Sequence, residues 1–176
     1  MASPVGHALV GVGLAAVSVP LLGATPGPAL WIGAIIASGV PDLDIIGIWL
    51  GYEPERVHRR ATHSLIVLSA LAALVSLASL LPWAPFELPT VWAWAIALLA
   101  HPLVDTLVTR NEEEGSNWGI PLFWPLWSHR FGLPRPLVPS PGVESYGSLA
   151  LLRDLLPEIA LFGLTCLTLV LLGSVL

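Results

Sequence analysis

The sequence predicts an all-α integral membrane protein with about five transmembrane helices. Hydrophobic residues make up 55% of the 176 residues, charged residues make up only 11%, and the mean hydropathy is +0.80. An ordinary soluble domain is about one quarter charged, so a chain this apolar is expected to lie in a bilayer. Each span needs roughly 20 residues, which leaves room for one bundle of about five spans. We therefore expect a single transmembrane domain, residues 1–176.

The first charge-free stretch is predicted to form two spans. Residues 8–40 contain no charged side chain, and this stretch is too long for one ordinary span. Thr25-Pro26-Gly27-Pro28 interrupts it, and proline with glycine breaks helices and favours turns. We expect a first span at about Val5–Leu22 and a second at about Ala29–Val40.

Three more apolar segments are predicted to cross the membrane. They lie at about Thr62–Leu81, Thr90–Thr109 and Leu155–Leu176. Thr62 or Ser64 is placed to cap the first turn of the third span. In the fifth span, Pro157 fits the first helical turn, and Glu158 is expected near the lipid–water interface.

Two other segments are expected to meet the membrane without crossing it. Ile45–Leu50 is apolar but too short to cross, which predicts a re-entrant or surface helix. Trp118–Phe131 is rich in aromatic residues, and Trp and Tyr favour the lipid–water boundary. This segment is therefore predicted to be re-entrant or interfacial.

The basic residues indicate how the bundle is oriented. All 7 are arginine, and a five-span topology places every one of them on the side of the amino terminus. Positive residues favour the cytoplasmic side, so we expect a multi-pass protein of the cytoplasmic (inner) membrane with its amino terminus inside. The same topology gathers widely separated polar residues on that side, which predicts one site at the cytoplasmic edge: His7, Asp42, Asp44, His58, His63, His101 and Asp105.

Several classes of protein are disfavoured. The formal net charge of −5 argues against a nucleic-acid partner. The single cysteine, Cys166, can form neither an internal disulfide nor a CxxC metal knuckle. The sequence contains no P-loop, GxSxG or HExxH motif. No basic residue precedes Arg56, so a cleavable signal peptide is not expected.

Two pairs of polar residues carry most of the predicted chemistry. His101 and Asp105 are four positions apart, which places them on one helical face, and titratable groups inside a span are costly and usually functional. The alternative is a His–Asp hydrogen bond that joins two helices. Asp42 and Asp44 can face one ion from an extended turn after Pro41, because a cation relieves the repulsion between carboxylates. The alternative is a pair of solvated helix caps.

The segment around the remaining histidines adds candidate ligands and phosphate-binding groups. His58 and His63 are about 140° apart around a helix, so His58 is expected in the loop and His63 in the first turn of the third span. Arg59 and Arg60 suit bidentate contacts to phosphate oxygens, and a basic cluster at the membrane surface is the alternative. His129 follows the aromatic segment and ranks below the other four histidines.

Imidazole and carboxylate together favour a divalent metal, zinc first, with manganese or iron as alternatives. The seven candidate ligands exceed one tetrahedral site, which leaves one or two ions open. Such a site can activate water for hydrolysis. Asp44, Arg59 and Arg60 are the candidate catalytic residues, with the arginines stabilising charge that develops on a phosphate.

The order of these motifs resembles that of a known family. His7 is followed by PDLD at 41–44, HRRATHS at 58–64, HPLVD at 101–105 and NWGIPLFWPLWSHRF at 117–131. This pattern resembles the membrane-bound metal-dependent hydrolases, the family that includes a DNA-damage-inducible, LexA-regulated inner-membrane protein. The resemblance covers most of the chain, and its elements are specific together although each is weak alone.

The resemblance implies a multi-helix membrane hydrolase whose ligand pattern is similar to that of zinc-dependent phospholipase C. It implies the same metal ligands, which are His7, Asp42, Asp44, His58, His63, His101 and Asp105. It leaves Arg59 and Arg60 as groups that contact the ligands or the substrate. The sequence departs from the family pattern at Gly6, where a hydroxyl residue is expected, and in the long acidic insertion after Asp105.

Three functions fit this sequence. The first is a hydrolase that cleaves a phosphate ester of a lipid or lipid-linked substrate, and we favour it because a site at the cytoplasmic interface meets head groups. The second is a divalent-metal binding or transport protein that uses the same ligands, although Glu87 is the only charge on the opposite side. The third is a non-catalytic membrane interaction protein whose histidines join helices. The oligomeric state stays open.

Overall fold

The computed structural model describes residues 2–52, 60–109, 119–138 and 149–176, and their regular structure is helical. The five longer helices are α1 (Pro4–Leu22), α2 (Pro28–Gly39), α5 (Leu65–Ala78), α6 (Leu88–Val108) and α7 (Leu149–Val175). The short elements are η1 (Val40–Asp44), α3 (Ile45–Trp49) and η2 (Ala61–His63). These ranges contain no strand, only an isolated bridge between Ile120 and Phe131. The predicted all-α fold is confirmed.

Within the part of the chain that the structure describes, four segments are long and apolar enough to cross a membrane. They are Pro4–Leu22, Pro28–Gly47, Leu88–Val108 and Leu155–Val175. The third predicted span is instead the shorter helix α5, with 14 residues. At 1.5 Å per residue this helix is about 21 Å long, less than the roughly 30 Å of a hydrocarbon core. The bundle therefore has four full-length candidate spans and one short apolar helix.

The start of α5 differs in detail from the prediction. Ser64 is the N-cap, because its hydroxyl oxygen accepts the backbone N–H groups of Ile66 and Val67. Thr62 is not the cap, and His63 lies in the η2 turn just before the helix, not in its first turn. From this turn the buried His63 ring reaches His101 and Asp105.

The last helix also differs from the prediction. Its candidate membrane span, Leu155–Val175, agrees with the predicted fifth span. The helix itself begins earlier, at Leu149, so Pro157 lies inside the helix and not in its first turn. Glu158 is fully buried among the helices, near the start of the candidate span Leu155–Val175. Hydrogen bonds stabilise Glu158 in this buried position, because its carboxylate accepts the backbone N–H and the hydroxyl of Ser3 at the start of α1.

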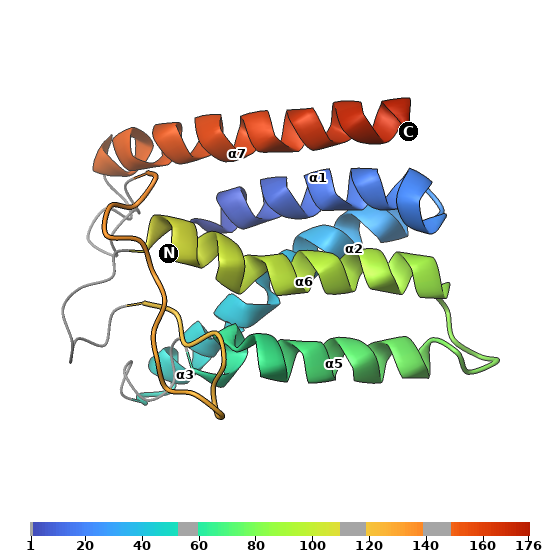
Figure 1. Ribbon diagram of the computed structural model, residues 1–176, viewed down its shortest axis with the longest axis horizontal. Coiled ribbons are helices and arrows are strands. Elements are labelled where there is room, and N and C mark those ends of the chain that lie inside the picture. The colour runs from blue at the N-terminus through green and yellow to red at the C-terminus, as the bar shows by residue number, and fades with distance from the viewer. Residues whose placement is uncertain (1, 53–59, 110–118, 139–148) are drawn as a thin grey trace.

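Close contact between small residues holds the bundle together. The helices run side by side, and α1 contacts α2, α6 and α7 (Figure 1). A Cβ atom at Gly11 would lie 2.9 Å from the carbonyl oxygen of Ala34, so glycine lets α1 and α2 approach. One buried core consists mostly of alanine: Ala15, Ala24, Leu30, Ala34, Ala93 and Ala97. Membrane helices associate through such close packing, because lipid is as apolar as their side chains.

One end of the bundle collects the polar segments. The start of α1, the η1 and η2 turns and the end of α6 all lie there (Figure 1). Residues 119–138 run across this end and bind backbone to backbone, with Leu65 N–H donating to Leu122 O at 2.8 Å and Leu133 N–H donating to Thr109 O at 3.0 Å. Trp127 is 54% exposed on this segment.

Candidate metal centre

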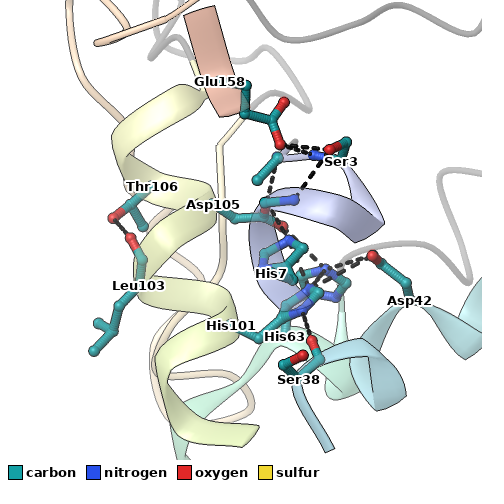
Figure 2. Close-up of polar contacts among 12 residues, drawn as sticks. Ser3, His7, Ser38, Asp42, His63, His101, Leu103, Asp105, Thr106 and Glu158 are labelled. Carbon is teal, nitrogen blue, oxygen red and sulfur yellow. Dashed lines mark hydrogen bonds and ion pairs between the residues drawn. The ribbon is translucent and has the colours of Figure 1, made fainter. Parts of the chain in front are cut away.

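Four side chains from three separate segments converge at this end of the bundle. They are Asp42 of η1, His63 of η2, and His101 and Asp105 of α6. One donor atom of each residue lies within 4.8 Å of the other three (Figure 2). His63, His101 and Asp105 are fully buried, whereas the Asp42 side chain is 21% exposed. We call these residues the four-donor group.

The separations within the four-donor group suit one small cation. The Nε2 atoms of His63 and His101 are 3.2 Å apart. Asp42 Oδ1 lies 3.6 Å from the first Nε2 and 3.5 Å from the second. Asp105 Oδ2 lies 3.3 Å and 3.6 Å from the same two atoms. Ligands about 2.0–2.1 Å from a tetrahedral ion are about 3.3 Å from one another. These five separations are close to the edges of a tetrahedral site, and the sixth, between the two carboxylates, is within 4.8 Å.

The backbone fixes which nitrogen His101 presents to the site. Its Nδ1 lies 2.6 Å from the carbonyl oxygen of Ser38. A carbonyl oxygen only accepts hydrogen bonds, so Nδ1 carries a proton and donates it. In the neutral ring the lone pair is then on Nε2, which faces the other three donors. A histidine that binds metal typically has a partner of this kind on its second nitrogen.

A hydroxyl and a carboxylate hold His63 in the same way. The Thr62 hydroxyl donates to Asp44 Oδ2 at 2.7 Å. The hydroxyl oxygen of Thr62 lies 3.1 Å from His63 Nδ1. Because the Thr62 proton points to Asp44, its oxygen is left to accept the Nδ1–H of His63. Asp44 was predicted as a ligand and as a catalytic group. The structure places it behind His63, outside the four-donor group.

The charge around His63 favours a cation at its Nε2 atom. Burial lowers the pKa of His63, but contacts with Asp105 and Asp42 and the nearby charge of Asp44 outweigh this effect and raise the pKa to about 9. A proton on Nε2 is stabilised by Asp42 and Asp105, the two carboxylates of the four-donor group. The surroundings of Nε2 are therefore built for positive charge.

The carboxylates offer oxygen atoms that the protein leaves unsatisfied. Asp42 Oδ1 and Asp105 Oδ2 are buried, and neither has a hydrogen-bond partner among the described residues. Burying a carboxylate oxygen that accepts no hydrogen bond is costly, and a cation at this point, either a metal ion or a proton on a histidine Nε2, offsets this cost. These are the same two atoms that face the histidine Nε2 atoms. The residues present therefore fit a divalent ion, and their nitrogen and oxygen donors suit zinc, manganese or iron.

His7 contacts the four-donor group from outside. Its ring stacks on His101 with 3.7 Å between ring centroids, and its Nε2 lies 3.3 Å from Asp105 Oδ1. That oxygen also accepts the backbone N–H of Ala2 at 2.8 Å. The opposite oxygen of Asp105, Oδ2, faces His63 and His101. His7, predicted as a ligand, thus lies on the far side of Asp105.

The other predicted residues that the structure describes lie outside the group. Arg60 is exposed where η2 begins, close in sequence to His63. His58 and Arg59 fall outside the described residues. His129 is exposed and stacks on Trp127 with 5.1 Å between ring centroids, on the segment that crosses the end of the bundle.

Three groups at this end were missed from the sequence. Ser38 acts through its backbone carbonyl, which no sequence pattern reveals. Thr62 was considered only as a helix cap, although it is next to a candidate ligand. Glu158 was expected near the interface, and its place as a carboxylate in an otherwise apolar run was the signal that could have identified it as buried.

Fold and site together define a helical membrane protein that carries a buried His–Asp cluster able to hold a metal ion. The chain belongs to the YdjM inner membrane protein family, whose family model matches residues 1–176. Its place is therefore the inner membrane, as predicted. No curated protein and no solved structure matches the chain.

Proposed function

We propose that this protein is a membrane-embedded metal-dependent hydrolase that cleaves a phosphate ester of a lipid or lipid-linked substrate. The observation that carries the proposal is the four-donor group, in which two imidazoles and two carboxylates face one point at the end of a membrane bundle. The motif order supplies the reaction class, because it resembles that of the membrane-bound metal-dependent hydrolases. A site at the level of lipid head groups favours a lipid phosphate as substrate.

The distribution of arginine supports a site that faces the cytoplasm. The described arginines are Arg60, Arg130, Arg135 and Arg153, and they belong to segments at the site end of the bundle (Figure 1). The turns at the other end, between α1 and α2 and between α5 and α6, contain no arginine. Because positive residues favour the cytoplasmic side, we place the site on the inner leaflet.

The residues at the site divide into three roles. Asp42, His63, His101 and Asp105 bind the ion, and the Ser38 carbonyl and Thr62 orient the two rings. A divalent ion held there supplies Lewis acidity that activates water and polarises a phosphoryl oxygen. Asp42 is the one member of the four-donor group that is partly exposed, so substrate and water approach from its side.

The predicted catalytic residues keep separate parts in this proposal. We assign contacts with the phosphate oxygens of the substrate to Arg60, which is exposed just before η2, and to Arg59 beside it in the sequence. Asp44 acts through Thr62. Its carboxylate accepts the hydroxyl proton of Thr62, and the Thr62 oxygen then accepts the Nδ1–H of His63. We therefore assign Asp44 to positioning and the arginines to binding of the substrate phosphate.

A second candidate is a metal-binding protein without hydrolytic activity. It is favoured by the number of donors, because four protein ligands fill the tetrahedral sphere of a structural zinc site, whereas catalytic zinc keeps an open position. X-ray absorption of the metal-loaded protein distinguishes the two. A further oxygen ligand from water supports the hydrolase, and four protein ligands alone support the second candidate.

The direct test uses purified, metal-loaded protein in vesicles that contain a panel of phospholipids and lipid-linked phosphates. Release of phosphate or head group is measured by mass spectrometry. We expect release that falls by about 100-fold or more in His63→Ala and Asp105→Ala. His129→Ala is the matched control, because His129 is exposed and outside the four-donor group, and it should retain activity. Wild-type protein that releases nothing from the whole panel would overturn the proposal.

A further inference from the structure

Glu158 is a buried carboxylate that the proposed hydrolysis does not use. It lies on α7, within a segment long and apolar enough to span a membrane, and it is fully buried. Its Oε1 accepts two hydrogen bonds from Ser3, one from the backbone N–H at 2.6 Å and one from the hydroxyl at 2.6 Å. An ionisable side chain at such a position is costly, and it is usually retained for a function.

The neighbouring peptide links this carboxylate to a metal-binding candidate. The N–H of Ser3 donates to Glu158, and the N–H of Ala2, one residue earlier, donates to Asp105 Oδ1 at 2.8 Å. Two successive N–H groups of one peptide segment therefore bind one carboxylate from α7 and one from α6. Figure 2 shows Ser3 between Glu158 and the layer that contains Asp105 and His7.

The sequence leaves room for this contact at one glycine. A Cβ atom at Gly6 would lie 2.2 Å from Glu158 Oε1, so any larger residue displaces the carboxylate. The backbone N–H of Gly6 donates to the Ser3 hydroxyl at 3.2 Å, which holds that hydroxyl toward Glu158. The first turn of α1 is thus shaped around the Glu158 side chain.

We propose that Glu158 is a positioning residue for the metal ligand Asp105 and couples α7 to the metal centre through the Ala2–Ser3 segment. With the Ser3 N–H fixed by Glu158, the Ala2 N–H is held against Asp105 Oδ1, and the carboxylate turns its Oδ2 toward the four-donor group. α7 supplies no member of that group, yet its position controls how well Asp105 binds. This inference rests on the metal site of the proposed function.

The test measures binding of Co²⁺, whose visible absorption reports its ligands. Glu158→Leu removes both hydrogen bonds, and we expect Co²⁺ binding about tenfold weaker with a changed absorption spectrum, as for other groups that orient metal ligands. Glu158→Gln keeps a carbonyl oxygen as acceptor, so its Co²⁺ affinity should stay within about twofold of the wild-type value.

A second pair of variants tests the same contact without changing Glu158. Gly6→Ala should weaken Co²⁺ binding about as much as Glu158→Leu, because the added Cβ displaces the carboxylate. Gly163→Ala, on α7, is its control, because nothing lies within 4 Å of a Cβ atom there. This pair also carries the test if Glu158→Leu does not fold.

The outcomes separate the two proposals. Wild-type affinity and spectrum in both Glu158→Leu and Gly6→Ala would overturn the positioning role and leave the metal site intact. A purely structural role for Glu158 would lower the melting temperature with the Co²⁺ spectrum unchanged, and this result also overturns the proposal. Wild-type protein that binds no Co²⁺ would overturn the metal site and the positioning role together.

Discussion

The Nε2 atoms of His63 and His101 face each other at 3.2 Å, although 38 positions separate the two residues in the sequence. The second nitrogen of His101 is committed to a carbonyl oxygen and that of His63 lies against a hydroxyl, so both rings turn Nε2 to the same point. Two carboxylate oxygens complete the group around that point. This arrangement favours a cation shared by all four residues.

The first prediction concerns the ligands themselves. His101→Ala removes one of the four donors, so affinity for Zn²⁺ should fall by about 100-fold or more, because even groups behind a ligand cost 10–100-fold. Competition with a chromophoric chelator measures the affinity. His129→Ala provides the comparison and should bind Zn²⁺ like the wild type. Equal affinity in His101→Ala and His129→Ala would remove His101 from the site.

The second prediction concerns the groups that orient His63. Thr62→Val keeps the shape of the side chain but removes the hydroxyl between His63 and Asp44, so Zn²⁺ affinity should fall about tenfold. Thr106→Val is the matched control, because Thr106 is on α6 and its hydroxyl bonds only to Leu103 O in the same helix in the described contacts. If the two variants bind Zn²⁺ alike, Thr62 does not orient His63.

The third prediction concerns pH. Metal binding must displace the proton from Nε2 of His63. Burial lowers the pKa of this ring, but the contacts with Asp105 and Asp42 outweigh burial and raise the pKa to about 9. Below that pH the ring is protonated in the metal-free protein, so each unit of pH gained should raise the apparent metal affinity about tenfold for this one proton. Chelator competition at pH 6, 7 and 8 measures the slope, and affinity that stays constant over this range would contradict it.

The fourth prediction concerns helix packing near the site. Gly11→Ala places a Cβ atom 2.9 Å from the carbonyl oxygen of Ala34, and backbone cannot move away cheaply, so the variant should lose about 1–3 kcal/mol of stability. Thermal unfolding in detergent measures the loss. Gly163→Ala meets no atom within 4 Å and should be neutral or slightly stabilising. Similar melting temperatures for the two variants would rule out close packing of α1 on α2 at Gly11.

Much of the fold could be predicted because apolar composition and helix-breaking residues are local signals. The turn at Thr25–Pro28 and the apolar runs predicted three of the helices closely: α1, α2 and α6. The length of α5 was less predictable because apolar residues, Leu80 and Leu81, continue past its end. The start of α7 was less predictable because the helix begins before the long apolar run and includes Arg153 and Asp154. The bend at Asp42 was predicted as an extended turn, but it is the 3₁₀ helix η1.

The candidate site could be predicted in part for a similar reason. Spacing on one helix placed His101 and Asp105 together, and topology brought Asp42 and His63 to the same end. Spacing could not distinguish the role of Asp42 from that of Asp44, because the directions of their side chains depend on the 3₁₀ turn. In this turn Asp42 points to the other three donors, and Asp44 points to Thr62. The role of Glu158 depends on its hydrogen bond to Ser3 at the start of α1. These two residues are 155 positions apart in the sequence, so no local pattern predicts the contact.

The metal content of the purified protein tests the central claim most directly. Elemental analysis of the wild type, expressed with zinc, manganese and iron in the medium, should find about one divalent ion per chain. The His63→Ala/His101→Ala double variant should contain none, while His129→Ala should contain the wild-type amount. Wild-type protein without metal, or a double variant with as much metal as the wild type, would contradict the account.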